Sequence, residues 1–313
     1  DEVTIGNKKG DEWVADAIEE LQSMPNVVIK NRSQVFGYYD HNMLVMFERT
    51  RDHIQNPTQY TPRQKLWYIR AKEVIISTGS IERPLVFANN DRPGIMLASS
   101  AKEYLKVYGV AVGKKPLIFT NNDSAYGTAI EFKKNGIQPT IVDTRSSSEN
   151  ELVLEAKKLG IDILFEHGIA NASGHLKVKS ATVGKLDKDK NNFKNLQEID
   201  CDCICVSGNW TPTVHLASQS GNKLKFDEAS DAFLPDQSKQ REVVVGSANG
   251  SFTLERSLKE GFEQGFKISN KLTNQNTATD HPISDEKTLG QHDKFWCMPL
   301  PKGKHYKRFV DFQ

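Results

Sequence analysis

Long hydrophobic runs are absent from this sequence. No apolar stretch approaches the roughly 20 residues that a membrane-spanning helix needs, and no charged segment followed by an apolar one opens the chain. A net charge of either sign is nearly absent too, because 41 basic residues face 40 acidic ones. The charge of the whole molecule therefore attracts neither nucleic acid nor anionic lipid. We expect a cytoplasmic protein without a membrane or nucleic-acid partner.

Cysteine is scarce, with four residues in a chain of 313. Three of them, Cys201, Cys203 and Cys205, alternate along a predicted strand, so we expect their side chains on one face. Neighbours on one face of a strand are ~7 Å apart, too far to share one tetrahedral zinc ion unless the strand bends. We predict that these cysteines are buried and act as small hydrophobic residues, and we predict no metal site. The alternative is that the three cysteines have a redox function.

A glycine-rich phosphate-binding loop is missing near the start of the chain. The sequence begins with Asp1, and no strand followed by glycines precedes the first predicted helix, residues 11–24. We therefore expect an interior piece of a longer chain that lacks its opening strand and loop. Such a piece exposes a sheet edge and apolar residues that would otherwise be covered, which predicts self-association.

The same kind of loop is degraded in the middle of the chain. After a predicted buried strand, residues 116–119, the three fingerprint positions hold Thr120, Asn122 and Ala125, and only the third keeps a small residue. The side chains at the first two positions hinder the close approach of a phosphate, although Asn122 and Ser124 offer donors of their own. The pattern predicts a dinucleotide-binding fold whose nucleotide site is degraded.

Two other stretches have the pattern of a nucleotide site. A predicted strand, residues 74–76, is followed by Thr78-Gly79, where the missing Cβ permits a close backbone approach. A second predicted strand, residues 243–245, runs into Gly246-Ser247-Ala248-Asn249-Gly250 and a helix, which present backbone N–H groups and the positive end of a helix dipole. The predicted nucleotide-binding residues are Thr78, Gly79, Gly246, Ser247, Asn249 and Gly250, with Asn122 and Ser124 in the middle of the chain and Asp143 at the usual place of a ribose-binding acid.

The order of these elements predicts an α/β fold of the two-dinucleotide-binding-domain flavoprotein type, that is, FAD/NAD(P)-binding and Rossmann-like. The first domain, residues 1–110 and 205–275, is expected to be incomplete at its N-terminus, and the second, residues 111–204, to be inserted within it. Residues 276–313 are interpreted as a linker or arm toward a missing C-terminal domain. His41, in the turn of a hairpin predicted from residues 34–39 and 43–49, and His215, at a polar helix start, are given structural roles.

Three long strings of this sequence carry a resemblance. They are RPLVFANNDRPGIMLASSAKEYLKVYGV at residues 83–110, FTNNDSAYGTAIEF at residues 119–132 and SGNWTPTVHLASQSG at residues 207–221. They resemble the alpha subunits of heterotetrameric sarcosine oxidases and, more loosely, the related opine-oxidase and amine-dehydrogenase alpha subunits. The resemblance covers nearly the whole chain, with two departures: the family's N-terminal glycine-rich loop and its C-terminal folate-binding domain are missing.

The resemblance implies the nucleotide-binding and assembly part of an oxidoreductase that demethylates sarcosine to glycine. The products of that whole complex are formaldehyde or methylene-tetrahydrofolate and hydrogen peroxide. Its cofactors are NAD in the alpha subunit, FAD in the beta subunit, FMN at the alpha–beta interface and tetrahydrofolate in the missing domain, and its partners are the beta, gamma and delta subunits. Asn249-Gly250 stands where related flavoproteins carry Gly-Asp, which agrees with NAD rather than FAD. No catalytic residue is expected here, so this piece alone is expected to be inactive.

The basic segment near the C-terminus is predicted to bind a phosphate group. By the resemblance it lies near the alpha–beta interface, and we predict that Lys304, Lys307 or Arg308 helps to hold the phosphate of FMN. Two alternatives stay open: a non-catalytic interaction scaffold with a vestigial NAD site, and an NAD(P)H or amine dehydrogenase subunit. Visible absorption separates a bound flavin from NAD.

Overall fold

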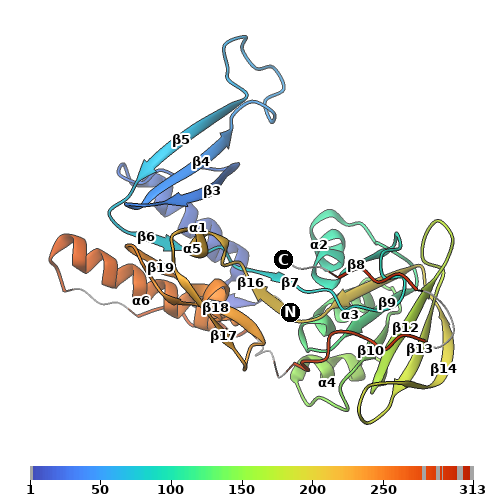
Figure 1. Ribbon diagram of the computed structural model, residues 1–313. Coiled ribbons are helices and arrows are strands. Elements are labelled where there is room, and N and C mark those ends of the chain that lie inside the picture. Colours follow the sequence, from blue (N-terminus) through green and yellow to red (C-terminus); the bar gives the residue numbers. More distant parts are fainter. Residues whose placement is uncertain (1–2, 277–279, 287–289, 291, 302–305, 311–313) are drawn as a thin grey trace. The chain divides into compact units, whose positions relative to one another are not determined.

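The computed structural model describes residues 3–276, 280–286, 290, 292–301 and 306–310. Contacts divide the chain into unit 1, with Asp1–Ser80 and Thr211–Glu286, and unit 2, with Ile81–Trp210 and Lys287–Gln313 (Figure 1). The chain passes between the units along two short paired strands, β7 (Ser80–Glu82) and β16 (Trp210–Pro212). None of the described helices is both long and apolar enough to cross a membrane.

Unit 2 is built on a five-stranded parallel sheet. Its strand order is β11-β10-β9-β15-β8, and each neighbouring pair is parallel. Strands in parallel sheets are usually buried on both faces, and every residue of β9 and β15 is buried. The strands are β8 (Ile95–Leu97), β9 (Pro116–Thr120), β10 (Thr140–Asp143), β11 (Asp162–Phe165) and β15 (Cys203–Ser207).

Helices cover one face of this sheet, and a three-stranded antiparallel sheet covers the other. Ile118 and Ile141 point into the helix-side core, whereas Phe119 and Val142 point into the core under the second sheet. Because successive side chains of a strand point to opposite faces, one apolar run supplies both cores. The covering elements are α2 (Ala98–Tyr108), α3 (Ser124–Lys134), α4 (Glu151–Lys158), β12 (His167–Ser173), β13 (Ser180–Leu186) and β14 (Phe193–Asp200).

The units divide the chain at other places than the predicted domains. Residues 81–110, predicted in the first domain, lie in unit 2. The reason is that β8 pairs with β15 and α2 packs against α3, so the segment completes the five-stranded sheet and its helical layer.

Residues 292–301 of the segment predicted as an arm also pack on unit 2. Met298 is 1% exposed and belongs to the core that includes Leu85 and Ile169. Its backbone N–H donates to the carbonyl of Val86 at 2.8 Å, and the Val86 N–H donates to the carbonyl of Trp296 at 2.9 Å. Residues 292–301 therefore form part of the unit.

The three cysteines near β15 do not share one face, so that prediction is wrong for Cys201. Cys203 and Cys205 lie in the helix-side core, but Cys201 lies in the opposite core. The chain bends before β15 begins, because the Asp202 carboxylate accepts the backbone N–H groups of two lysines, Lys114 and Lys115, each at 2.8 Å. Burial raises the pKa of Cys201 to about 12, and a hydrogen bond with Cys203 together with burial raises that of Cys205. All three are free thiols, and the raised pKa of Cys201 and of Cys205 disfavours their reactive thiolate forms.

Unit 1 contains smaller sheets around one core. The predicted hairpin around His41 is confirmed, and β3, β4 and β5 form an antiparallel sheet. β6 and β19 form a parallel pair. The core includes Tyr38, Leu44, Ile76 and Val244. The elements of unit 1 are β1 (Thr4–Ile5), β2 (Lys8–Lys9), α1 (Gly10–Ser23), β3 (Ser33–Tyr39), β4 (Met43–Arg49), β5 (Gln64–Arg70), β6 (Val74–Ile76), α5 (His215–Gln219), β17 (Lys223–Asp227), β18 (Ala232–Gln237), β19 (Glu242–Val244), η1 (Gly246–Asn249) and α6 (Leu254–Thr273).

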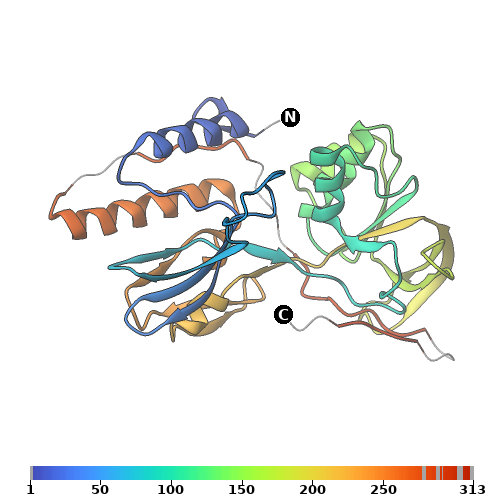
Figure 2. The ribbon, with the colours of Figure 1, turned by 90° about the horizontal axis from the view of Figure 1, so that it is seen from above.

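Two amphipathic helices of unit 1 bury none of their described residues. They are α1 and α6, which lie on one side of the unit's strands in Figure 2. On α1, Val14, Ile18 and Leu21 are each more than 40% exposed. In the paired strand β6, Ile75 is 43% exposed although both its neighbours are buried. Unit 1 thus leaves apolar stripes uncovered on α1 and at β6.

Protonation of Glu82 is expected to make unit 2 more stable at acidic pH. Its carboxylate is 4% exposed and accepts the backbone N–H and hydroxyl of Ser99, at 2.8 and 2.7 Å, at the start of α2. Burial raises the pKa of Glu82 above its ordinary value of 4.5, although the hydrogen bonds of Ser99 oppose the shift. The native state therefore holds the proton to higher pH than the unfolded state does, and this contribution is lost as the pH rises through the native pKa.

Urea unfolding at a series of pH values from 4 upward tests this expectation. The urea midpoint of the wild type should fall as the pH rises through the native pKa of Glu82. The Glu82→Gln variant cannot ionise at this position and should not show this fall. Glu103→Gln, at an exposed position of α2, is the matched control and should follow the wild type. Parallel curves for Glu82→Gln and wild type would contradict the assignment.

Candidate functional site

The predicted residues of unit 1 meet at one edge of its parallel strand pair. β6 and β19 run in the same direction, so Thr78-Gly79 and the loop from Gly246 follow the carboxyl ends of neighbouring strands, the usual ligand edge of such sheets. Both glycines have positive φ, +75° and +71°. A Cβ on Gly79 would lie 3.9 Å from the Ser247 Oγ. Folding therefore brings these two stretches together.

A carboxylate from α6 accepts a hydrogen bond from the backbone N–H at the start of this loop. The Gly246 N–H donates to the Glu260 carboxylate at 2.8 Å, and the side-chain amide of Asn249 donates to its other oxygen at 2.5 Å. The Thr78 hydroxyl donates to the carbonyl of Thr213 at 2.7 Å. Gly250 ends η1 with φ +83°. Sequence reasoning missed Glu260, because a single acid on an amphipathic helix carries no signal of its partner.

In unit 2 the predicted donors point into the protein. The Asn122 amide donates to the carbonyl and hydroxyl of Ser207, each at 3.1 Å. The Ser124 hydroxyl donates to the Asn122 Oδ1 at 2.6 Å and accepts the indole N–H of Trp210 at 3.2 Å. These side chains link α3 to β15.

Arg145 joins two buried acids at the carboxyl ends of β9 and β10. Its guanidinium lies 2.7 Å from Asp123 and 2.7 Å from Asp143, which also accepts the Tyr126 hydroxyl at 2.7 Å. Asp143 is 0% exposed, so the predicted ribose-binding acid is held by protein groups. Burial alone would lower the pKa of Arg145, but the hydrogen bond and charge of Asp143, with those of Asp123, raise it above its ordinary value. The guanidinium therefore stays charged.

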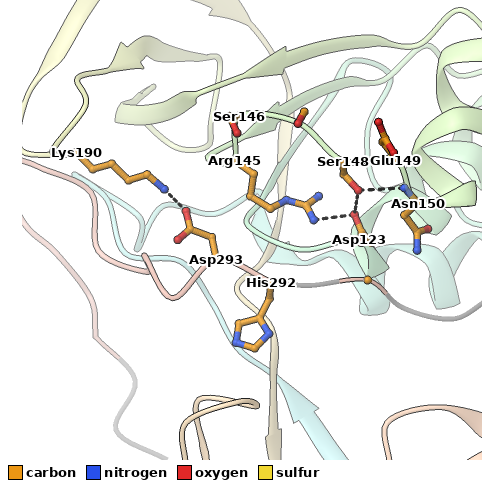
Figure 3. A pocket seen from close by; sticks show the side chains of 11 residues that line it. Asp123, Arg145, Ser146, Ser148, Glu149, Asn150, Lys190, His292 and Asp293 are labelled. Atoms are coloured by element: carbon orange, nitrogen blue, oxygen red, sulfur yellow. Dashed lines mark hydrogen bonds and ion pairs between the residues drawn. The ribbon is translucent and has the colours of Figure 1, made fainter.

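Beside this cluster lies a polar pocket of about 570 Å³. Figure 3 shows Arg145 and Ser148 directed at Asp123, and Lys190 directed at Asp293. The pocket adjoins the sheet edge where a dinucleotide would be expected. Sequence reasoning did not find it, because it is assembled from segments far apart in the chain. Its lining residues are Asp123, Arg145, Ser146, Ser147, Ser148, Glu149, Asn150, Lys190, Gly290, His292 and Asp293.

The predicted phosphate-binding cations near the C-terminus lie on the surface where they are described. Lys307 and Arg308 are exposed. The Lys307 carbonyl accepts the Asn89 N–H at 2.7 Å, and the Arg308 guanidinium lies 3.4 Å from the Cys297 sulfur. Lys304 lies outside the described residues.

Relatives of this chain are found among curated proteins, whereas no family model matches it. It is 33% identical over 311 residues to the sarcosine oxidase subunit alpha of Corynebacterium sp. (strain U-96), covering 96% of this chain and 32% of that protein. It is 31% identical over 320 residues to the sarcosine oxidase subunit alpha of Rhizobium meliloti (strain 1021), covering 100% of this chain and 30% of that protein. The chain spans about a third of the length of these relatives.

Solved structures confirm the predicted α/β fold of the two-dinucleotide-domain flavoproteins. Thioredoxin reductase from T. acidophilum matches with a TM-score of 0.63 and 16% identity, over 85% of this chain and 82% of that chain. L-proline dehydrogenase from P. horikoshii matches with a TM-score of 0.58 and 21% identity, over 87% of this chain and 46% of that chain. Together with the sequence relatives, these matches show that the chain is homologous, over nearly its whole length, to about a third of the sarcosine oxidase alpha subunit.

Proposed function

We propose that this chain is the nucleotide-binding and assembly part of a sarcosine oxidase alpha subunit. The observation that carries the proposal is the 33% identity over 96% of the chain to such a subunit. The whole complex would convert sarcosine to glycine, releasing hydrogen peroxide and either formaldehyde or methylene-tetrahydrofolate. The partners would be the beta, gamma and delta subunits.

The role of this chain is to bind and to assemble, with the chemistry left to the complex. The cofactors of the complex would be FAD in the beta subunit and FMN at the alpha–beta interface, which supply the oxidation chemistry, tetrahydrofolate as one-carbon acceptor, and NAD held by this chain. The titratable side chains at the strand ends are tied up in internal contacts, as Glu260 is with Gly246 and Asn249. We therefore assign no catalytic acid, base or nucleophile to this chain.

The strand ends of unit 1 fit an uncharged part of NAD better than its pyrophosphate. Gly79 and Gly246 leave the backbone open to close approach, and Ser247 adds a half-buried hydroxyl beside them. The Gly246 N–H, a natural phosphate donor, is already bonded to Glu260. We assign a ribose or the adenine to Thr78, Gly79, Ser247 and the loop that ends at Asn249-Gly250.

Contacts to FMN are proposed for the basic segment near the C-terminus. Exposed Lys307 and Arg308, with Lys304, would hold its phosphate at the interface with the beta subunit. Unchanged FMN content of the assembled complex after charge reversal of all three would remove this role.

Nucleotide content of the purified chain tests the main proposal. We expect denaturation to release NAD while the native sample shows no yellow colour. Gly79→Val should lower the NAD content about tenfold, because a branched side chain at φ +75° strains the turn and fills the space beside Ser247. Gly109→Val is the matched control, since it has φ +65° with no atom within 4 Å of an added Cβ. Equal NAD content in the two variants would contradict this site.

A non-catalytic scaffold with a vestigial NAD site is the second candidate. The Glu260 carboxylate at the Gly246 N–H favours it, because a negative charge there repels a phosphate. A chain that releases no nucleotide would select this candidate. A yellow chain would instead favour the NAD(P)H or amine dehydrogenase alternative.

The uncovered stripes of unit 1 are expected to cause self-association. Val14, Ile18 and Leu21 of α1 and Ile75 of β6 expose apolar surface that other polypeptide would normally cover. Light scattering at increasing concentration should show a mass above that of the monomer. Ile18→Lys with Leu21→Lys should shift the sample toward monomer, whereas Lys substitution of exposed Leu176 in unit 2 should not. A monomer at every concentration would contradict this expectation.

A further inference from the structure

In unit 2 the place of a bound phosphate is already taken by a carboxylate of the protein. α3 follows β9 directly, so its N-terminus is where dinucleotide-binding folds receive a pyrophosphate. Asp123 is the residue immediately before α3 and is 2% exposed. Its Oδ1 accepts the Ser148 hydroxyl at 2.9 Å and lies 2.7 Å from the Arg145 guanidinium. Asp123 thus supplies the negative charge that this helix end favours.

Several donors close to this position are committed to protein acceptors. The Asn121 amide donates to the carbonyl of Asp293 at 2.8 Å, and the Asp293 N–H donates to the carbonyl of Asn121 at 2.8 Å. Asn122 and Ser124 bond to Ser207 and to each other. A phosphate would have to break these hydrogen bonds before these side chains could donate to it.

The cations nearby are also neutralised. Arg145 contacts both Asp123 and Asp143, and Lys190 pairs with Asp293. Glu149 adds a further acid to the pocket lining. The lining therefore has three acids, Asp123, Glu149 and Asp293, against two permanent cations, which repels an anionic ligand.

Space above the Asp123 carboxylate is limited as well. A Cβ on Gly290 would lie 2.1 Å from the Asp123 Oδ2, so the backbone of Gly290 rests against this oxygen. The same oxygen is buried and has no hydrogen-bond partner among the described residues. A phosphate that took the position of this carboxylate would have to displace both Asp123 and this backbone.

From these contacts we infer that Asp123, clamped by Arg145, replaces the phosphate of a dinucleotide, so that unit 2 keeps the dinucleotide-binding fold but does not bind NAD(P). The carboxylate places a negative charge at the helix end. The ion pairs of Arg145 join the ends of β9 and β10, and hydrogen bonds between Asn121 and Asp293 attach the segment at Asp293. Unit 2 then acts as a structural module, and any nucleotide of this chain belongs to unit 1.

Hydrogen exchange of the whole chain with excess NAD⁺, NADP⁺ or ADP-ribose tests this inference. We expect no added protection in peptides covering residues 121–126 and 144–150 of the wild type. Asp123→Asn keeps the size of the side chain but removes its charge, and it should gain protection there with an affinity about tenfold or more above that of the wild type. Asp162→Asn removes an exposed acid at the start of β11 and is the matched control.

Each outcome decides the question. Protection of residues 121–126 in the wild type would overturn the inference, and so would Asp123→Asn and Asp123→Ser variants that fold but gain no nucleotide binding. Asp123→Ser also removes the charge and leaves a small polar side chain, and it serves if Asp123→Asn does not fold. Peptides covering residues 76–80 and 244–250 report separately on the proposed site of unit 1, so its failure is distinguishable.

Discussion

Replacing Arg145 by methionine is expected to lower the free energy of unfolding of unit 2 by about 3 to 5 kcal/mol. The guanidinium is 10% exposed and contacts two acids that are almost fully buried, Asp123 and Asp143. Methionine fills a similar volume but leaves both carboxylates without their cation in a site of low polarity. Urea unfolding followed by tryptophan fluorescence, with Trp210 and Trp296 in unit 2, measures the loss.

Neutralising the whole cluster should restore most of this stability. In the triple variant Asp123→Asn, Asp143→Asn and Arg145→Met, no charge of this cluster remains buried. Replacing all members of a buried ion pair together often leaves the stability of the protein unchanged. Arg63→Met is the surface control: its guanidinium pairs with Asp52 at 2.8 Å while 74% exposed, and such pairs contribute little. An Arg145→Met protein as stable as the wild type would show that the cluster does not hold unit 2 together.

Shortening Met298 to alanine is expected to cost about 2 to 5 kcal/mol of the stability of unit 2. The side chain is 1% exposed and fills the core between the two sheets with Leu85, Phe87 and Ile169. Its loss removes apolar contacts and leaves a cavity, because a close-packed core relaxes only in part. Thermal unfolding should shift to lower temperature in step with this loss.

Leu300→Ala provides the matched control two residues further along. Leu300 is 41% exposed, so its truncation should change stability by less than about 1 kcal/mol. Equal effects at Met298 and Leu300 would mean that the segment behaves as the arm predicted from sequence. A large difference supports the segment as part of the fold of unit 2.

Local signals were enough to predict most elements. The alternation and turn residues around His41 predicted the hairpin of β3 and β4, and apolar runs predicted β6, β9 and β19. The glycine at the end of β6 and the small residues after β19 also marked both stretches as parts of a nucleotide site, and the parallel pairing of the two strands brings them to a common edge. These features depend on residues close together in the chain.

Contacts between distant segments were not predicted. Glu260 binds the Gly246 N–H from the following helix, and Asp293 binds Asn121 from the far end of the chain. Cys201 faces away from Cys203 because Asp202 binds two backbone N–H groups of another loop. Composition and periodicity describe a residue's own element, and they do not describe its partner elsewhere in the chain.

The sequence by itself determined the α/β class, the dinucleotide-type strand-to-helix units and the loss of the phosphate-loop glycines. Only the tertiary structure decided which groups are paired at the strand ends. In unit 2 they are Asp123 and Arg145, and in unit 1 Glu260 and the Gly246 N–H. The physical reason is that a buried charge or backbone donor must be paired on folding. The partner that satisfies it is chosen by packing, which the order of residues along the chain does not reveal.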